Sequence, residues 1–440
     1  MTMTAKYNMD TDRYKDVVSM ASGRRRWLWM PTIFFVNSLP HIVVMLSLVM
    51  FKRFGMDNGK LAFTLSLPFI PWILRPLIEK AVTLSAFAPK TWIMATGFVF
   101  WISLAAISFF IPGAIWRTDI IWLIMAISLA GCVHSVALEQ FYVPHVFTMS
   151  KGIHGRTCTI LHGLSLMLGI GVFAMFAGNI EVITRSKIQA WSTVFLVMAV
   201  LFLALWIYHS WSLPDVESPY LTRKRIPASH NYFRLPKFRV FSRKPVWLVF
   251  MFIFLLPEAL ISKIGSLFII DAGHNGGLGL SPQEFALIQG TVGMLGMTVG
   301  TVINNLLPSS INRQILRLLM VGSVMMQSII YVYMSHTLPG SMLLVNVYVF
   351  VAEVCFGFGL SSYQNDFLNA NKTSSSNYST IMALMAISML MPGMFSGYML
   401  EATSYRQYFI IVMACAFFTF MITPFITVSS DEDEKPKPSL

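Results

Sequence analysis

The chain carries repeated apolar stretches of about 20 residues, separated by short polar connections. An α-helix of that length crosses the hydrocarbon core of a bilayer. Because backbone polar groups find no water in lipid, each crossing segment must satisfy its own hydrogen bonds, as a helix does. The sequence therefore predicts an all-α integral membrane protein with about twelve transmembrane helices.

Composition and charge support this class and set an expected orientation. Of the 440 residues, 55% are hydrophobic and only 12% are charged, whereas about a quarter of the residues of a soluble protein are charged. With the N-terminus placed in the cytoplasm, roughly 22 Lys and Arg fall in inner loops and roughly 7 in outer loops. The net charge of +12 then reflects these inner loops rather than a nucleic-acid partner. We expect both termini in the cytoplasm and no cleaved signal peptide.

The even number of spans and a basic connection after the sixth divide the chain into two six-helix bundles. The expected segments are a cytoplasmic N-terminal segment (1–26), the first bundle (27–212), a basic cytoplasmic loop (213–244), the second bundle (245–429) and a charged cytoplasmic tail (430–440). This plan suits transporters built from repeated bundles, in which the solute site lies near the midplane between them.

The sequence contains no motif for catalysis or nucleotide binding. It lacks a P-loop and an HExxH motif, and its four cysteines have no metal-ligand spacing. We therefore expect no enzyme activity, no metal and no cofactor. The leading class is a secondary, ion-driven transporter of a small-molecule solute, working as a monomer in the lipid bilayer.

The stretch from Leu255 to Leu280 places charges inside an apolar helix. It holds Glu258, Lys263 and Asp271, and each charge costs about 2.5–3.5 kcal/mol at membrane depth. Glu258 and Lys263 are about 140° apart around the helix, so each is expected to meet another helix, the solute or water. We predict proton coupling or solute binding for Glu258 and solute binding for Lys263, against structural salt bridges as the alternative. For Asp271, a capping role and proton coupling both stay open.

Other spans carry further ionisable groups. Glu139 and His134 could form a proton path, because histidine titrates near neutrality. The alternative is a gating salt bridge for Glu139 and a hydrogen-bonded core histidine. Glu353 is the corresponding candidate for proton coupling in the second half. Arg75 is expected either to extend to the membrane interface or to pair with Glu79.

Two polar residues and several glycines complete the predicted set. Gln289 and Tyr363 join Lys263 and Glu258 as candidate solute-binding residues. Glycines permit close approach of helices in a membrane. The predicted gating and packing positions are Arg75, Glu79, Gly290, Gly293, Gly357, Gly359, Pro392 and Gly393.

The second half resembles a known family. Its motifs are EALISKIGSLFIIDAGHNGGLGLSPQEFALIQGTVGMLGMTVG (Glu258–Gly300), GFGLSSY (Gly357–Tyr363) and MALMAISMLMPGMFSGYMLEATSYRQYF (Met382–Phe409). These resemble the AmpG-like muropeptide permeases of the major facilitator superfamily. The matched positions are Glu258, Lys263, Asp271, Gly276, Gly277, Gly279, Gly290, Thr291, Gly293, Met391, Pro392, Gly393, Met394 and Gly397.

The first half resembles the family less closely. The family pattern has two aspartates four residues apart, where this chain has Ser135 and Glu139. The superfamily loop after the second span is represented here only by Glu79 and Lys80. The resemblance implies a proton-driven importer of anhydro-muropeptides, the fragments recycled from the cell wall, in the bacterial inner membrane. Two alternatives stay open: a transporter of another solute, such as a siderophore, peptide, acyl-CoA-like or drug-like molecule, and a membrane sensor or scaffold without transport.

Overall fold

A computed structural model describes residues 26–113, 116–142, 153–213, 245–308, 311–370 and 375–425. Every regular element in these ranges is helical. The expected N-terminal segment (1–26), basic loop (213–244) and tail (430–440) lie outside the described residues, apart from the single boundary positions 26 and 213.

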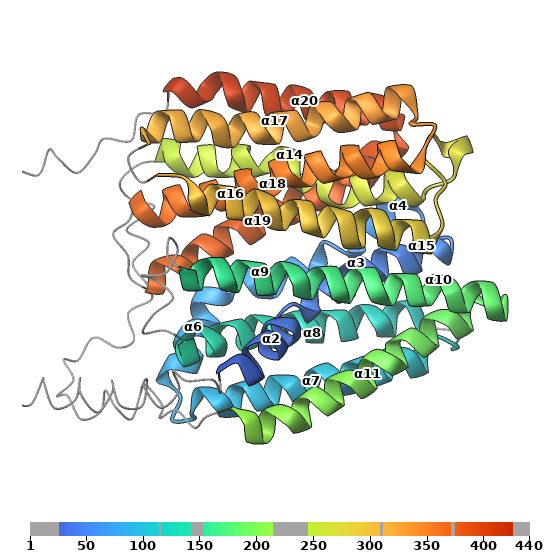
Figure 1. The fold of residues 1–440 in the computed structure, drawn as a ribbon, viewed down its shortest axis with the longest axis vertical. Coiled ribbons are helices and arrows are strands. Elements are labelled where there is room, and N and C mark those ends of the chain that lie inside the picture. The colour runs from blue at the N-terminus through green and yellow to red at the C-terminus, as the bar shows by residue number, and fades with distance from the viewer. Residues whose placement is uncertain are drawn as a thin grey trace, which may run out of the picture.

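The N-terminal half runs from blue to green in Figure 1. Its helices are α2 (Arg26–Asn37), α3 (Leu39–Arg53), α4 (Asn58–Thr64), η1 (Leu67–Phe69), α5 (Ile70–Ile73), α6 (Arg75–Leu84), α7 (Pro89–Phe110), α8 (Trp116–Tyr142), α9 (Ile153–Met167), η2 (Leu168–Val172), α10 (Phe173–Thr184) and α11 (Lys187–Ser212).

The C-terminal half runs from yellow to red. Its helices are α14 (Pro245–Ile270), η3 (Gly273–Asn275), α15 (Pro282–Phe285), η4 (Ala286–Gly293), α16 (Met294–Leu306), α17 (Arg313–Thr337), α18 (Met342–Ala370), α19 (Ser375–Glu401), α20 (Tyr405–Ile422) and η5 (Thr423–Phe425).

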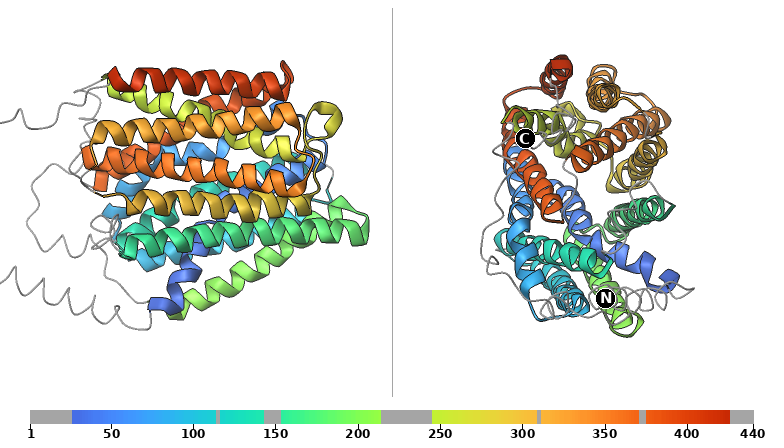
Figure 2. Two further views of the ribbon diagram at one scale, coloured as in Figure 1. Left: turned by 45° about the horizontal axis from the view of Figure 1, so that its top comes forward. Right: turned by 90° about the vertical axis from the view of Figure 1, so that its left-hand side faces the viewer.

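These helices confirm the predicted number of spans. Ten are long and apolar enough to cross a membrane, and two bent pairs bring the total to twelve. The α2–α3 pair bends by 46° and the pair formed by α4–α5 and α6 bends by 42°. Pro40 and Pro76 lie just after these bends, where the residue before a proline disfavours helical geometry. The chain is thus a multi-pass membrane protein built from two six-helix bundles. Figure 2 shows the helices of the two halves from the end.

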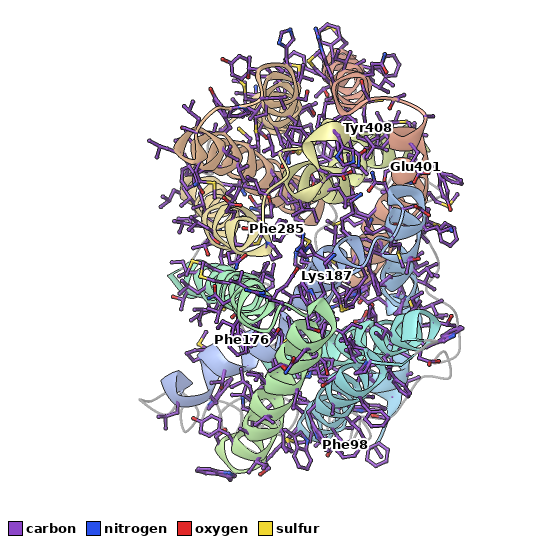
Figure 3. The ribbon with its side chains drawn as sticks, turned by 90° about the vertical axis from the view of Figure 1, so that its right-hand side faces the viewer. Phe98, Phe176, Lys187, Phe285, Glu401 and Tyr408 are labelled. Carbon is purple, nitrogen blue, oxygen red and sulfur yellow. The ribbon has the colours of Figure 1, made fainter. Side chains whose placement is uncertain are left out.

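The outer surface of the bundles is apolar, as a bilayer requires. Phe109 and Ile183 are each 80% exposed, and Trp122 and Val182 are each 69% exposed. Phe98 projects from the rim of the molecule in Figure 3, whereas Phe285 lies among the helices. Large exposed side chains of this kind would form an aggregation surface in water but pack against lipid tails in a membrane.

The two halves meet along two helix pairs. α4 packs on α19, and the continuous span α9–η2–α10 packs on α15–η4–α16. Where η2 faces η4 the backbones touch, because a Cβ added at Gly290 would lie 2.8 Å from the Cα of Gly171. Both glycines lie in π-helical segments, a rare geometry that is frequent at functional sites. We call these two lines of contact the seam.

Candidate functional site

The centre of the candidate site is α14, the most buried of the described spans. Pro257 lies inside this helix and has no N–H to give the carbonyl of Ile253. The hydroxyl of Thr419 on α20 lies 3.3 Å from that carbonyl oxygen, and the hydroxyl of Tyr408 donates to the Leu260 carbonyl at 2.9 Å. The polar backbone of α14 is therefore satisfied by α20.

Glu258 points from α14 into the C-terminal bundle. Its carboxyl group interacts with the side-chain amide of Gln327 on α17. Glu353 on α18 accepts a hydrogen bond of 2.9 Å from Nε2 of Gln289 in η4, and Tyr331 lies near both carboxyl groups. Three of the predicted residues, Glu258, Gln289 and Glu353, thus belong to one buried cluster.

Lys263 points the other way, toward the N-terminal half. Its side chain is 4% exposed, and its Nζ has no hydrogen-bond partner among the residues described. Nζ lies 5.5 Å from the centre of the Phe69 ring. A Cβ added at Gly393 would lie 2.8 Å from this Nζ and 3.0 Å from the Ser66 hydroxyl. The cation therefore sits at the seam, beside residues of α19 and of the first bundle.

Asp271 follows the last turn of α14 and joins the two halves. Its carboxylate binds Lys52 at 3.1 Å and accepts hydrogen bonds from Asn58 at 3.1 Å and Tyr405 at 2.9 Å. Burial raises the pKa of Asp271, but the hydrogen bonds from Asn275 and Asn58 and the charge of Lys52 outweigh burial. The net pKa of this carboxyl group therefore lies below its usual value of 3.8.

A polar pocket of about 320 Å³ lies beside Asp271. Its lining comes from both halves, and Glu401 in this lining accepts a hydrogen bond of 2.7 Å from the Gly59 N–H. Glu401 and Lys187 lie toward the viewer at this end of the molecule in Figure 3. Asp271 is thus a fully bonded link between the halves.

The structure excludes one of the two alternatives predicted for Arg75. Arg75 does not extend to the membrane interface, because its side chain is fully buried. It forms an ion pair with Glu139 and donates to the Ser135 hydroxyl at 3.0 Å. The bend before α6 places Arg75 at the start of a helix in the bundle interior, beside α8. Glu139 and Ser135, the two positions of the family's aspartate pattern, therefore bind one arginine.

His134 is hydrogen-bonded in the core of the first bundle, as one of its two predicted alternatives has it. Its Nδ1 lies 2.8 Å from the Thr96 hydroxyl, and none of the contacts described for His134 or Glu139 connects the two. Beside His134 is a cavity of about 10 Å³, also lined by His209, which is room for about one water molecule. The histidine is held in the core between α7 and α8.

Tyr363 lies apart from Lys263. Its ring stacks on Phe254 with centroids 4.8 Å apart, inside a separate apolar cluster of the C-terminal bundle. Tyr363 also lies ten residues beyond Glu353 on α18, about 15 Å along the helix axis. The structure therefore does not bring this predicted solute-binding residue to the others.

The predicted glycines lie at close helix contacts. A Cβ at Gly357 would lie 2.1 Å from the Met297 carbonyl oxygen, and one at Gly359 would lie 2.7 Å from the Ser323 hydroxyl. Gly293 faces the side chain of Glu353. Pro392 lies inside α19, next to Gly393. The contacts of Gly357 and Gly359 join α18 to α16 and α17. The contact of Gly393 with Lys263 joins α19, at the seam, to α14.

Sequence reasoning missed several partners. Gln327 and Tyr331 lie in the apolar run MMQSIIY, where an uncharged polar residue gives only a weak signal. Lys52 and Asn58 flank a connection between helices and look like ordinary loop residues. Only the fold shows that they reach Asp271.

The fold is that of known transporters. No protein-family model matches the chain, and no curated protein matches it. The solved structure of the nucleoside transporter NupG has a TM-score of 0.67 and 13% identity, covering 91% of this chain and 99% of that one. The inward open xylose transporter XylE from E. coli has a TM-score of 0.61 and 11% identity, covering 90% and 95%. The chain therefore has the major facilitator fold.

Proposed function

We propose that this protein is a secondary transporter that moves an anionic, muropeptide-like solute across the membrane together with protons. The fold supports transport, because NupG carries nucleosides and XylE carries xylose on the same architecture. The muropeptide assignment rests on the sequence motifs of the second half, and the AmpG-like branch of the superfamily is part of this proposal.

The unpaired Lys263 carries the proposal. A buried charge without a partner is costly in a membrane and is retained mainly for function. Nζ of Lys263 has no partner among the described side chains and lies where the two halves meet. A carboxylate of the solute, such as that of a peptide stem, would complete the ion pair. Solute binding would then bridge both halves, as alternating access about a central site requires.

Proton coupling is assigned to the C-terminal half. Glu139 is already paired with Arg75, so its role is a fixed or gating ion pair. Glu258 and Glu353 are buried and have no ion pair within the described chain. Asp271 is bound by Lys52 and serves as a link between the halves. We assign the protons to Glu258 and Glu353.

Orientation and direction follow from the sequence. Basic residues are concentrated in the loops that would lie inside, so both termini are placed in the cytoplasm. A bacterial inner membrane then sets a proton gradient that drives inward movement of the solute.

The test is uptake of a labelled anhydro-disaccharide-peptide into proteoliposomes, with and without an imposed pH gradient. We expect gradient-dependent accumulation that an uncoupler abolishes. Lys263→Ala leaves a buried solute carboxylate unpaired, which costs 2 kcal/mol or more, so uptake falls by about 30-fold or more. Lys60→Ala is the matched control, because Lys60 is 71% exposed and its ion pair is with Asp57, three residues earlier at the start of α4.

A competition panel separates the alternatives. Inhibition by muropeptides but not by nucleosides or xylose supports the proposed solute. Inhibition by uncharged nucleosides or sugars alone, with normal uptake by Lys263→Ala, would remove the anionic solute from the proposal. Tight binding without flux in a folded preparation would favour the sensor instead.

A further inference from the structure

The C-terminal bundle buries two carboxyl groups without a cation. Glu258 is 5% exposed and Glu353 is 6% exposed. The ionisable group that lies near both is Tyr331 on α17. No lysine, arginine or histidine of the described chain contacts either carboxyl group. Two ionised carboxyl groups buried in one bundle would repel each other, because the dielectric constant of the interior is low.

Each carboxyl group has a primary amide as its partner. Gln289 Nε2 donates to Glu353 Oε1 at 2.9 Å, and the side chain of Gln327 interacts with Glu258. Both glutamines are at least nine-tenths buried. In each of them the carbonyl end, Oε1, has no hydrogen-bond donor within the described residues, and Oε2 of Glu258 has none either.

These three oxygens, Oε1 of Gln289, Oε1 of Gln327 and Oε2 of Glu258, lack a hydrogen-bond donor in the part of the chain that the structure describes. A carboxylate and an amide carbonyl can only accept hydrogen bonds, so an ionised cluster leaves the amide oxygens unsatisfied. A protonated carboxyl group gains one O–H donor. It can donate that hydrogen to the amide oxygen while its other oxygen accepts from the amide N–H. The result is a closed pair of two hydrogen bonds, in which no buried oxygen needs a further donor.

We propose that Glu258 and Glu353 are both protonated in this conformation, as acid–amide pairs with Gln327 and Gln289. The C-terminal bundle is then loaded with two protons. The use of these protons to drive a solute rests on the proposed function, whereas their presence does not.

The seam offers a way to release one of the protons. Gln289 is the neighbour of Gly290, whose backbone touches Gly171 of the first bundle. A movement of the halves that shifts η4 displaces the Gln289 amide from Glu353. The Glu353 carboxyl group then loses the acceptor for its hydrogen and can pass the proton to water.

Infrared spectroscopy of the purified, reconstituted protein tests this without any solute. A protonated carboxyl group gives a C=O stretch that shifts in D₂O. We expect such a band at neutral pH in sodium-containing buffer, with one component lost in Glu258→Gln and another in Glu353→Gln. Both substitutions replace the acid by an amide of the same shape, so the paired geometry and the fold are retained.

Three further variants make the assignment specific. Glu139→Gln should leave the band unchanged, because Glu139 is paired with Arg75. Gln289→Leu and Gln327→Leu should each shift one component to higher frequency, because the carboxyl group loses its acceptor. A band that is absent at neutral pH, or that appears only when sodium is removed, overturns the proposal, and the second result identifies a metal cation as the occupant.

The two proposals fail separately. A protonated pair with no uptake of any muropeptide leaves this inference standing and overturns the assigned solute. Normal proton-driven uptake without a protonated carboxyl band overturns this inference alone.

Discussion

The two halves treat their buried charges differently. In the N-terminal half, Arg75 and Glu139 form an ion pair inside the bundle, with Ser135 as a further partner. In the C-terminal half, Glu258 and Glu353 have the amides of Gln327 and Gln289 as hydrogen-bond partners, and Lys263 has no partner among the residues described. The first arrangement pairs opposite charges, whereas the second holds two carboxyl groups and a lysine that have no ion pair among the described residues.

This difference indicates that the two halves have different roles in the proposed transport. The ion pair of Arg75 and Glu139 joins α6 to α8. Glu258 and Lys263 on α14 and Glu353 on α18 have no ion pair among the described residues. In the proposed mechanism, protons and the anionic solute stabilise these groups by binding to them. In the same proposed mechanism, the N-terminal half is the rigid partner and the C-terminal half carries the binding chemistry.

The most direct test of this difference between the halves removes one cation from each of them. Arg75→Met leaves Glu139 in the bundle without its partner, which costs about 3–5 kcal/mol in the free energy of unfolding. Lys263→Met removes a buried charge that has no partner to lose, so stability is unchanged or rises. Thermal unfolding in detergent measures both.

The double variant Arg75→Met with Glu139→Leu is the control, and it should regain most of the lost stability. Equal destabilisation by Arg75→Met and Lys263→Met would show that Lys263 has a structural partner, and the comparison would fail.

A smaller effect is expected from two glycine-to-alanine substitutions, one beside Pro40 in the first half and one beside Lys263 in the second half. Gly131→Ala on α8 puts a methyl group 2.2 Å from the rigid ring of Pro40, which costs about 1–3 kcal/mol of stability. In Gly393→Ala the added methyl group lies closest to the flexible end of Lys263 and to the Ser66 hydroxyl, and the Ala259 carbonyl oxygen is at an ordinary contact distance of 3.7 Å. We expect Gly393→Ala to fold normally and to raise the KM for the solute several-fold. A stable Gly131→Ala beside an unfolded Gly393→Ala would reverse the comparison.

The smallest effect concerns the link between the halves. Because the pKa of Asp271 lies below its usual value, its carboxylate stabilises the folded state at all pH values above about 4. This stabilisation is lost as the pH falls through the folded-state pKa. The melting temperature of the wild type should therefore exceed that of Asp271→Asn at pH 7, and the difference should shrink in acid. A difference that is independent of pH would mean that the charge of Asp271 contributes nothing.

The sequence allowed the spans and their charges to be predicted, but not the partners. Apolar runs of fixed length identify twelve spans because the bilayer imposes that length. Glu258 and Lys263 stand out because a charge inside such a run is costly. Their spacing around the helix also correctly separated their environments. The partners come from other helices, so nothing local indicates that Arg75 meets Glu139 or that Glu258 meets Gln327.

Backbone irregularities were also beyond sequence reasoning. The π-helical turns at η2 and η4 place Gly171 against Gly290, and no local pattern marks them. The bend before α6 brought Arg75 inward, where a straight helix would have carried it toward the interface. The stacking of Tyr363 on Phe254 also joins two helices distant in the sequence, so no local pattern indicates it.

The contacts between α14 and α20 have a consequence for biosynthesis. Three hydroxyl groups that satisfy α14 at Ile253, Leu260 and Asp271 come from residues 134 to 166 positions later in the chain. At 5–20 residues per second, a ribosome needs about 10–30 s to make that length. During this interval the Ile253 carbonyl, which Pro257 leaves without its helical N–H partner, lacks the Thr419 hydroxyl. The seventh span is therefore the natural client of an insertion chaperone, and truncation before α20 should send the nascent protein to proteolysis.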